Sequence, residues 1–151
     1  MVYDLIVIGG GPAGYLGAER AGHAGLNTLL IEKRFIGGVC LNEGCIPSKS
    51  LLYSAKIYDN AKHGEKYGVV TNDISFNHEA VIERKNKVVK TLVSGIKSQL
   101  KKNKVTVVEG FGEILGRNQD GYEVKVGDQA YTAKRLLIAT GSMPVIPPIP
   151  G

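Results

Sequence analysis

Residues 5–14 of the sequence read LIVIGGGPAG, a short apolar run that leads directly into a glycine-rich turn. The apolar run, taken over 3–8, predicts one buried parallel strand. Pro12 suits the first turn of a helix, which should continue over 13–24 and stop at Gly25. A second apolar run follows over 27–31. The sequence therefore predicts a βαβ unit within a Rossmann-type α/β fold, a parallel sheet with flanking helices.

The glycines of this turn have separate physical tasks. Gly9 allows the tight turn, Gly11 lets the backbone approach a pyrophosphate, and Gly14 lets the helix pack closely on the strand. The helix N-terminus offers N–H groups and a partial positive charge to phosphates. Glu32, at the end of the second strand, can accept hydrogen bonds from both hydroxyls of a ribose. The pattern predicts dinucleotide binding without separating FAD from NAD. The alternative is a glycine-rich turn that binds no ligand.

The rest of the chain continues the α/β pattern. We expect helices over 45–62 and 77–103, strands over 105–109 and 135–139, and a small antiparallel meander over 111–133. On the first of these helices, Leu51, Leu52 and Ala55 should form the inner face. An Asn77 cap should begin the second. The tail over 143–151 holds four prolines and is predicted to be a linker.

Composition and charge are those of an ordinary globular chain. The 151 residues carry a net charge of +5, but many of the basic residues fall within 84–104, where an apolar helical stripe makes them one solvated face. No nucleic-acid-binding motif accompanies them, so we expect no nucleic-acid partner. The first apolar run is too short for a signal peptide or a membrane span. We therefore expect a protein of the cytoplasm, or of an organelle whose targeting segment has been removed, that makes no membrane contact.

The two cysteines, Cys40 and Cys45, lie in the segment GGVCLNEGCIPSK over 37–49. They could be buried free thiols, half of a zinc site, a structural disulfide or a redox-active disulfide. A zinc site is disfavoured because the sequence has no second cysteine pair and its three histidines are scattered, so we expect no metal. A disulfide closing so short a ring would stabilise the fold little. A redox-active disulfide fits better.

Helix geometry constrains such a pair. Residues five apart in a regular helix have Cα atoms ~8.5–9 Å apart, whereas disulfides need ~4.4–6.8 Å. The segment should therefore depart from a helix between the two sulfurs. Gly44 permits this, and Pro47 removes an N–H that a continuous helix would use. A nearby helix start and Lys49 would favour a thiolate.

Together these motifs resemble the pyridine nucleotide–disulfide oxidoreductases, a family of flavin-dependent enzymes. Three segments carry the resemblance over essentially the whole chain: the opening glycine motif with Glu32-Lys33, the run from Cys40 to Lys49, and the turn Ala139 to Ser142 before the proline-rich tail. The sequence Ile46-Pro47-Ser48-Lys49 looks most like the dihydrolipoamide dehydrogenase branch, since the glutathione branch generally has Val-Pro-Lys-Lys there.

The resemblance implies roles for individual residues. Cys45 would be the sulfur that faces the flavin, and Cys40 the sulfur that exchanges with the dithiol substrate. Glu32 would bind the adenosine ribose of FAD, Gly112 would present its backbone to the adenine, and Lys49 would lie near the flavin ring. Other residues expected to contact non-covalent FAD are Gly9, Gly11, Pro12, Ala13, Gly14, Lys33, Gly38, Val39, Cys40, Thr140, Gly141 and Ser142.

The resemblance also implies a larger enzyme. Residues 1–142 would be the N-terminal segment of an FAD-binding domain, and 143–151 a linker toward a domain that binds NAD. The full enzyme, a homodimer, would oxidise the lipoyl groups of 2-oxo acid dehydrogenase or glycine cleavage complexes. This segment alone would not turn over. Two features depart from the family pattern: the loop 33–36 is one residue short, and Glu43 replaces an apolar residue. The alternatives are another disulfide reductase, of mercuric or glutathione type, and a nucleotide-binding module without redox chemistry.

Overall fold

A computed structural model describes residues 2–143 and 145–150, and its centre is a four-stranded parallel sheet. The strand order is β4-β3-β2-β8, formed by β4 (Thr106–Glu109), β3 (Thr28–Glu32), β2 (Leu5–Ile8) and β8 (Leu136–Ile138). All three pairings are parallel. Helix α1 (Pro12–His23) connects β2 to β3. The predicted βαβ unit and the Rossmann-type fold class are confirmed.

Both faces of this sheet are buried, which explains why its strands are continuous apolar runs. On one face, Val7 and Leu30 pack with Ala18 of α1 and with Leu100. On the other face, residues such as Ile8 contact a second four-stranded sheet. Side chains alternate between the two faces along each strand, so the central strands β2 and β3 bury apolar residues on both sides.

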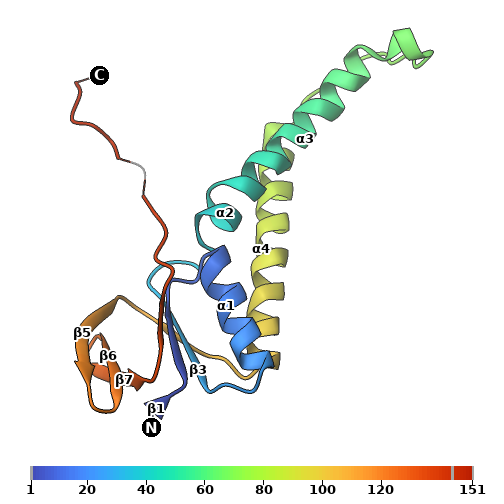
Figure 1. The fold of residues 1–151 in the computed structure, drawn as a ribbon. Coiled ribbons are helices and arrows are strands. Elements are labelled where there is room, and N and C mark those ends of the chain that lie inside the picture. The colour runs from blue at the N-terminus through green and yellow to red at the C-terminus, as the bar shows by residue number, and fades with distance from the viewer. Residues whose placement is uncertain (1, 144, 151) are drawn as a thin grey trace.

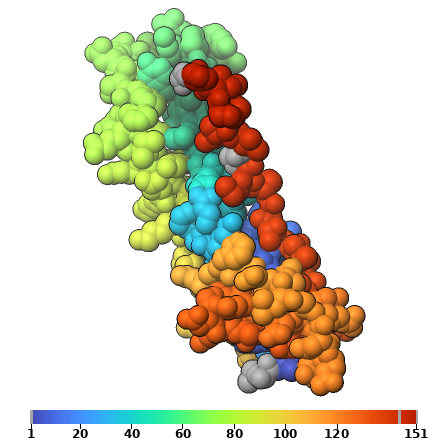
Figure 2. All heavy atoms as spheres, turned by 90° about the vertical axis from the view of Figure 1, so that its left-hand side faces the viewer, coloured from blue at the N-terminus to red at the C-terminus, as the bar shows by residue number. Residues whose placement is uncertain are grey.

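The second sheet contains the predicted meander, with strand order β1-β7-β6-β5. Strands β5 (Gly112–Asn118), β6 (Gly121–Val126) and β7 (Gln129–Ala133) are antiparallel neighbours, and β1 (Val2–Tyr3) adds to β7 in parallel. Figure 2 shows these strands, in orange, as a rounded lobe at one end of the molecule, opposite the end formed by the green segment around residues 60–70.

The apolar pattern predicts one continuous strand over 3–8, and this prediction is wrong. Asp4 separates β1 from β2, and each piece joins a different sheet. The Asp4 carboxylate accepts hydrogen bonds from the Asn27 N–H, at 3.0 Å, and from Lys134 Nζ, at 2.7 Å. These contacts hold the chain where it crosses from one sheet to the other.

The remaining helices form an extension from the sheet (Figure 1). A short helix α2 (Gly38–Asn42) precedes α3 (Cys45–Lys62), which leads through a 3-10 turn, η1 (Gly64–Tyr67), to the long helix α4 (His78–Lys102). The Asn77 cap is confirmed, since its Oδ1 accepts a hydrogen bond from the Ala80 N–H at 3.0 Å. The predicted tail has no regular secondary structure over the described residues 143 and 145–150; Pro144 and Gly151 lie outside the described residues.

The predicted inner face of α3 is wrong. Leu51, Leu52 and Ala55 are exposed, Leu52 to 68% of its surface. The buried residue of this helix is Ser50, whose Oγ accepts a hydrogen bond from Arg84 of α4 at 2.9 Å. A periodic stripe identifies the apolar side of a helix but does not say whether this chain covers it.

The packing of α1 on β2 yields a test with a matched control. A Cβ added at Gly14 would stand 1.7 Å from the Gly9 carbonyl oxygen, whereas one added at Gly95 of α4 meets no atom within 4 Å. Gly14→Ala should therefore lower the free energy of unfolding by about 1–3 kcal/mol or more, because backbone must move. Gly95→Ala should raise it by about 0.5–1 kcal/mol through helix propensity. Urea denaturation of both variants would check this, and an unchanged stability in Gly14→Ala would contradict it.

Candidate dinucleotide site

The glycine turn lies between the end of β2 and the start of α1, where the fold leaves backbone exposed. Gly9 has φ +106°, a conformation that side chains rarely adopt, and a Cβ there would meet the Ala139 carbonyl oxygen at 2.2 Å. Gly11 has open space around it, since the nearest atom to an added Cβ is 3.9 Å away. Gly9 and Gly14 therefore have structural tasks, while Gly11 faces the free volume that a ligand could occupy.

The first turn of α1 has polar groups to offer. Pro12 is the first residue of this helix, and in the described part of the chain no side chain caps the helix N-terminus. The N–H groups of Ala13 and Gly14 belong to this turn, where a helix has no internal hydrogen-bond partners for them. The partial positive charge of the helix adds to these donors, which suits an anionic group such as a pyrophosphate.

Glu32 lies at the end of β3, beside the glycine turn. Its carboxylate accepts hydrogen bonds from the Gly10 N–H and from the Arg34 N–H, both at 2.6 Å. These two bonds hold the acid in one orientation and connect the glycine turn to the loop that follows β3. The carboxylate retains further lone pairs for the hydroxyl donors of a ribose.

One pocket of about 520 Å³ brings most of the predicted residues together. The predicted residues that line it are Gly11, Pro12, Ala13, Glu32, Lys33, Gly38, Val39, Cys40, Thr140, Gly141 and Ser142. Gly9 and Gly14 do not line it, since Gly9 packs against Ala139 and Gly14 packs against Gly9. Gly112, at the start of β5, packs against side chains of β2 and β3, and Lys49 and Cys45 also lie outside the lining.

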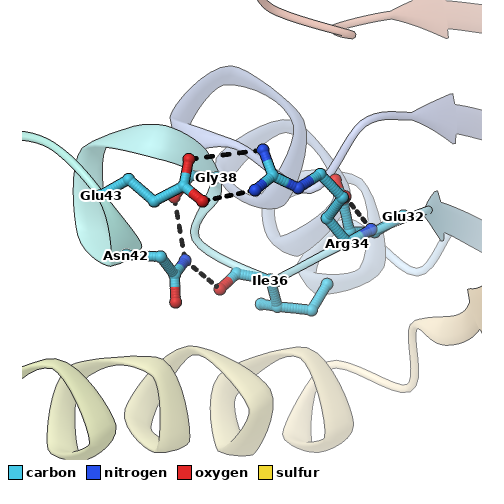
Figure 3. A network of polar contacts seen from close by, with 6 residues as sticks. All are labelled: Glu32, Arg34, Ile36, Gly38, Asn42 and Glu43. Atoms are coloured by element: carbon cyan, nitrogen blue, oxygen red, sulfur yellow. Dashed lines mark hydrogen bonds and ion pairs between the residues drawn. The ribbon is translucent and has the colours of Figure 1, made fainter. Parts of the chain in front are cut away.

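The same pocket is lined by five residues that were not among the predicted site residues: Arg34, Phe35, Glu43, Ala139 and Met143. Each lies close in the chain to a predicted residue, which is the only sequence signal that could have found them. Arg34 and Glu43 form a bidentate ion pair at the rim, in which Arg34 Nη1 donates to Glu43 Oε2 at 3.3 Å (Figure 3).

Cys40 and Cys45 lie on two different helices. Cys40 belongs to α2 and Cys45 begins α3, and the two residues between these helices leave the helical conformation. Glu43 has φ −129° and ψ −11°, and Gly44 has φ −123° and ψ −106°. The predicted departure from a helix between the two sulfurs is confirmed. Both residues are free thiols in the structure; that they cycle through a disulfide stays a prediction.

The two thiols lie close enough to affect each other. The neighbouring Cys45 thiol is the largest cause that raises the pKa of Cys40 above its ordinary value, and burial acts in the same direction. The Lys49 ammonium opposes both by favouring the thiolate. Cys40 is therefore a neutral thiol at pH 7 while Cys45 is reduced beside it.

Within residues 2–143 and 145–150, no three histidine, cysteine or acidic side chains gather as a metal site would require. None of the helices in that part of the chain is long and apolar enough to cross a membrane. The glycine turn, the helix N-terminus, the oriented acid and the adjoining cysteine pair define a dinucleotide-binding fold with a thiol pair at its site.

Comparison with known proteins gives the family. The family model described as pyridine nucleotide-disulphide oxidoreductase matches residues 3–151, so the chain belongs to that family. Curated relatives include the dihydrolipoyl dehydrogenases of Acholeplasma laidlawii, 44% identical over 99% of this chain, and of Mycoplasma pneumoniae, 45% identical over all of it. The chain spans 44% and 32% of the length of these two relatives.

A solved structure agrees with this result. The HOCl-induced flavoprotein disulfide reductase RclA from Escherichia coli, solved as a Cu(II) complex, matches with a TM-score of 0.79 and 29% identity. The match covers all of this chain and 31% of that protein. Membership of the family implies a flavin cofactor, and the pocket fits this, because Gly11, the first turn of α1 and the oriented Glu32 carboxylate line it together.

The coupling between the thiols predicts how Cys40 reacts. Cys45→Ala removes the largest cause of the raised pKa, so the pH at which iodoacetamide alkylates Cys40 at half its maximal rate should fall relative to the reduced wild type. Lys49→Met should raise that pH, because it removes the cation that favours the thiolate. Mass spectrometry of alkylated peptides over a series of buffers from neutral to alkaline pH measures both shifts. An unchanged midpoint in Cys45→Ala would show that the thiols do not interact.

Proposed function

We propose that this chain is the N-terminal, FAD-binding segment of a dihydrolipoyl dehydrogenase, which converts dihydrolipoamide and NAD⁺ to lipoamide and NADH. The observation that carries the proposal is that Cys40 lines the same pocket as the glycine turn and Glu32. A thiol pair that adjoins a flavin site can pass electrons from a dithiol to the flavin, whereas a nucleotide-binding module without redox chemistry has no use for it.

The residues of this chain would hold FAD in a defined order. Glu32 would bind the adenosine ribose, and the turn from Gly11 to Ala13 the pyrophosphate, as the free N–H groups and the open space favour. Residues 140–142 and Lys49 would lie along the rest of the cofactor. When bound, FAD supplies an acceptor for the electron pair that the dithiol releases.

The cysteines would carry the exchange with substrate. One thiolate of dihydrolipoamide attacks Cys40 Sγ of a Cys40–Cys45 disulfide, and the Cys45 sulfur leaves as a thiolate. The second substrate thiol then attacks the mixed disulfide, so that lipoamide leaves as a disulfide and both cysteines are reduced. Two electrons and two protons have passed from the substrate to the protein.

The wider assignments rest on the dihydrolipoyl dehydrogenase relatives, which are much longer than this chain. Residues 1–142 would form part of the FAD-binding domain and 143–151 a linker, with NAD bound by a further domain. The enzyme would be a cytoplasmic homodimer that acts on the lipoyl groups of 2-oxo acid dehydrogenase or glycine cleavage complexes.

Substrate assays on the full-length protein test this function. Dihydrolipoamide with NAD⁺ should support turnover, while oxidised glutathione and Hg²⁺ with reduced nicotinamide nucleotide should not. Faster turnover of glutathione or Hg²⁺ would assign the chain to another reductase of the family. Full activity after Cys40→Ser and Cys45→Ser together would leave only the nucleotide-binding interpretation.

A first prediction concerns the sulfurs. Thiol titration of the full-length protein in denaturant should detect two more thiols after reduction than after air oxidation, and both should be absent from the double Cys40→Ser, Cys45→Ser variant. The flavin should remain bound in that variant, since neither sulfur is needed for the adenosine and pyrophosphate contacts. Two free thiols at positions 40 and 45 in the oxidised protein would contradict the proposal.

A second prediction concerns Glu32. Glu32→Ala should weaken FAD binding by ~1–3 kcal/mol, a typical loss for charge-assisted hydrogen bonds. Glu109→Ala is the matched control, because Glu109 ends the neighbouring strand in register with Glu32 and does not line the pocket. Flavin retention through gel filtration and a fluorescence titration measure the effect. Equal FAD affinity in the two variants would remove Glu32 from the site.

A further inference from the structure

The segment between the two cysteines is fastened to the loop that follows β3. Glu43, which lies between Cys40 and Cys45, pairs with the guanidinium of Arg34 through two hydrogen bonds (Figure 3). An Arg–carboxylate pair of this bidentate kind fixes direction as well as distance. Arg34 is itself held at its backbone, because its N–H donates to Glu32.

A second residue between the cysteines makes contacts in the same region. Asn42 Nδ2 donates to the Ile36 carbonyl at 3.2 Å and to the Gly38 carbonyl at 2.9 Å. Figure 3 shows the Asn42 and Glu43 side chains both directed toward the chain that runs from Glu32 to Gly38. Two consecutive residues of the four that separate the sulfurs thus contact the loop after β3, Asn42 at Ile36 and Glu43 at Arg34.

These hydrogen bonds lie at the point where α2 and α3 must remain two separate helices. If α2 and α3 merged into one helix, the Cα atoms of Cys40 and Cys45 would lie ~8.5–9 Å apart, beyond the range in which a disulfide forms. Glu43 is the residue that leaves the helical conformation first, and its side chain is the one that Arg34 holds. The ion pair with Arg34 therefore opposes a change of residues 43 and 44 to the helical conformation.

We propose that Arg34 is a positioning residue for the cysteine pair: through Glu43 it holds the segment between Cys40 and Cys45 in the broken conformation that lets the two sulfurs meet. The inference rests on the proposed function, since it assumes that the two cysteines form a disulfide. It adds a residue from the loop after β3, on the adenosine side of the pocket, to the machinery of the thiol pair.

The size of the effect follows from exposure. The Arg34 and Glu43 side chains are 48% and 43% exposed, so water and salt screen the pair. Exposed pairs are worth little, and loss of this one should change the equilibrium constant for disulfide formation by roughly two- to fivefold. Removal of either partner frees the dithiol form to sample conformations with the sulfurs apart, so disulfide formation should become less favourable.

The experiment is a glutathione equilibrium on the full-length protein at pH 7. Glutathione disulfide oxidises the two thiols, giving the Cys40–Cys45 disulfide and two molecules of glutathione, and trapped samples are resolved by mass spectrometry. The variants are Arg34→Gln, Glu43→Gln and the double variant. Lys134→Gln, which breaks the Lys134–Asp4 ion pair between the two sheets, is the control.

The proposal predicts a specific pattern. Both single variants should lower the equilibrium constant by about two- to fivefold, and the double variant should lower it no further, because the two residues act through one contact. Raising the salt concentration should lower the constant in the wild type and leave the Arg34→Gln value nearly unchanged. Lys134→Gln should match the wild type.

Other patterns overturn it. Single variants that equal the wild type, effects that add in the double variant, or an equal salt response in all variants would each remove Arg34 from this role. A wild-type protein in which no Cys40–Cys45 disulfide forms at any glutathione ratio would instead refute the proposed function. The two failures are therefore distinguishable.

Discussion

The contact between α1 and β2 is the constraint on which the site depends. The Gly9 carbonyl oxygen occupies the space that a Cβ at residue 14 would need, so only glycine lets the helix begin this close to the strand. That approach places Pro12 and Ala13 of the first helical turn in the pocket lining, together with Glu32 from the end of the neighbouring strand. An anion site made in this way needs no cationic side chain, because backbone groups and the helix dipole supply the positive potential.

From that turn a chain of polar contacts leads to the sulfurs. The Gly10 N–H holds Glu32, Glu32 holds the Arg34 backbone, and the Arg34 side chain holds Glu43 between the cysteines. Two of these contacts join Glu32, the acid proposed to bind a ribose, to the segment between the cysteines. Residues 33–36 form a short loop between β3 and α2, and these contacts hold the loop in one conformation.

Much of the fold was predictable, because its signals are local. The apolar runs, the glycine turn and the Asn77 cap each act within a few residues, and the helical boundaries at Cys45 and Lys62 followed from them. Most of the residues that line the pocket could be predicted as well, since they belong to three sequence motifs. The break between the cysteines could be predicted from their spacing, because a continuous helix would hold the two Cα atoms too far apart for a disulfide.

The errors came from non-local contacts. The division of residues 3–8 between two sheets depends on Asp4 meeting Asn27 and Lys134, and no local pattern reports this. Helix α2, five residues long, is too short to show a periodicity. The Arg34–Glu43 pair joins residues nine apart across a turn, a spacing that no helix or strand rule selects. The exposed side of α3 was misjudged because an apolar stripe does not identify what covers it.

The position of β2 has a consequence for how the chain is made. This strand is synthesised long before β8, yet it is central in its sheet, between β3 and β8. Its second neighbour is β8, whose Leu136 pairs with Ile6, and the pairing of β1 with β7 likewise joins distant parts of the chain. Until β8 has been synthesised, one edge of β2 stays open to other strands. Contacts this far apart in sequence slow folding and lengthen the time in which a nascent chain needs protection from association.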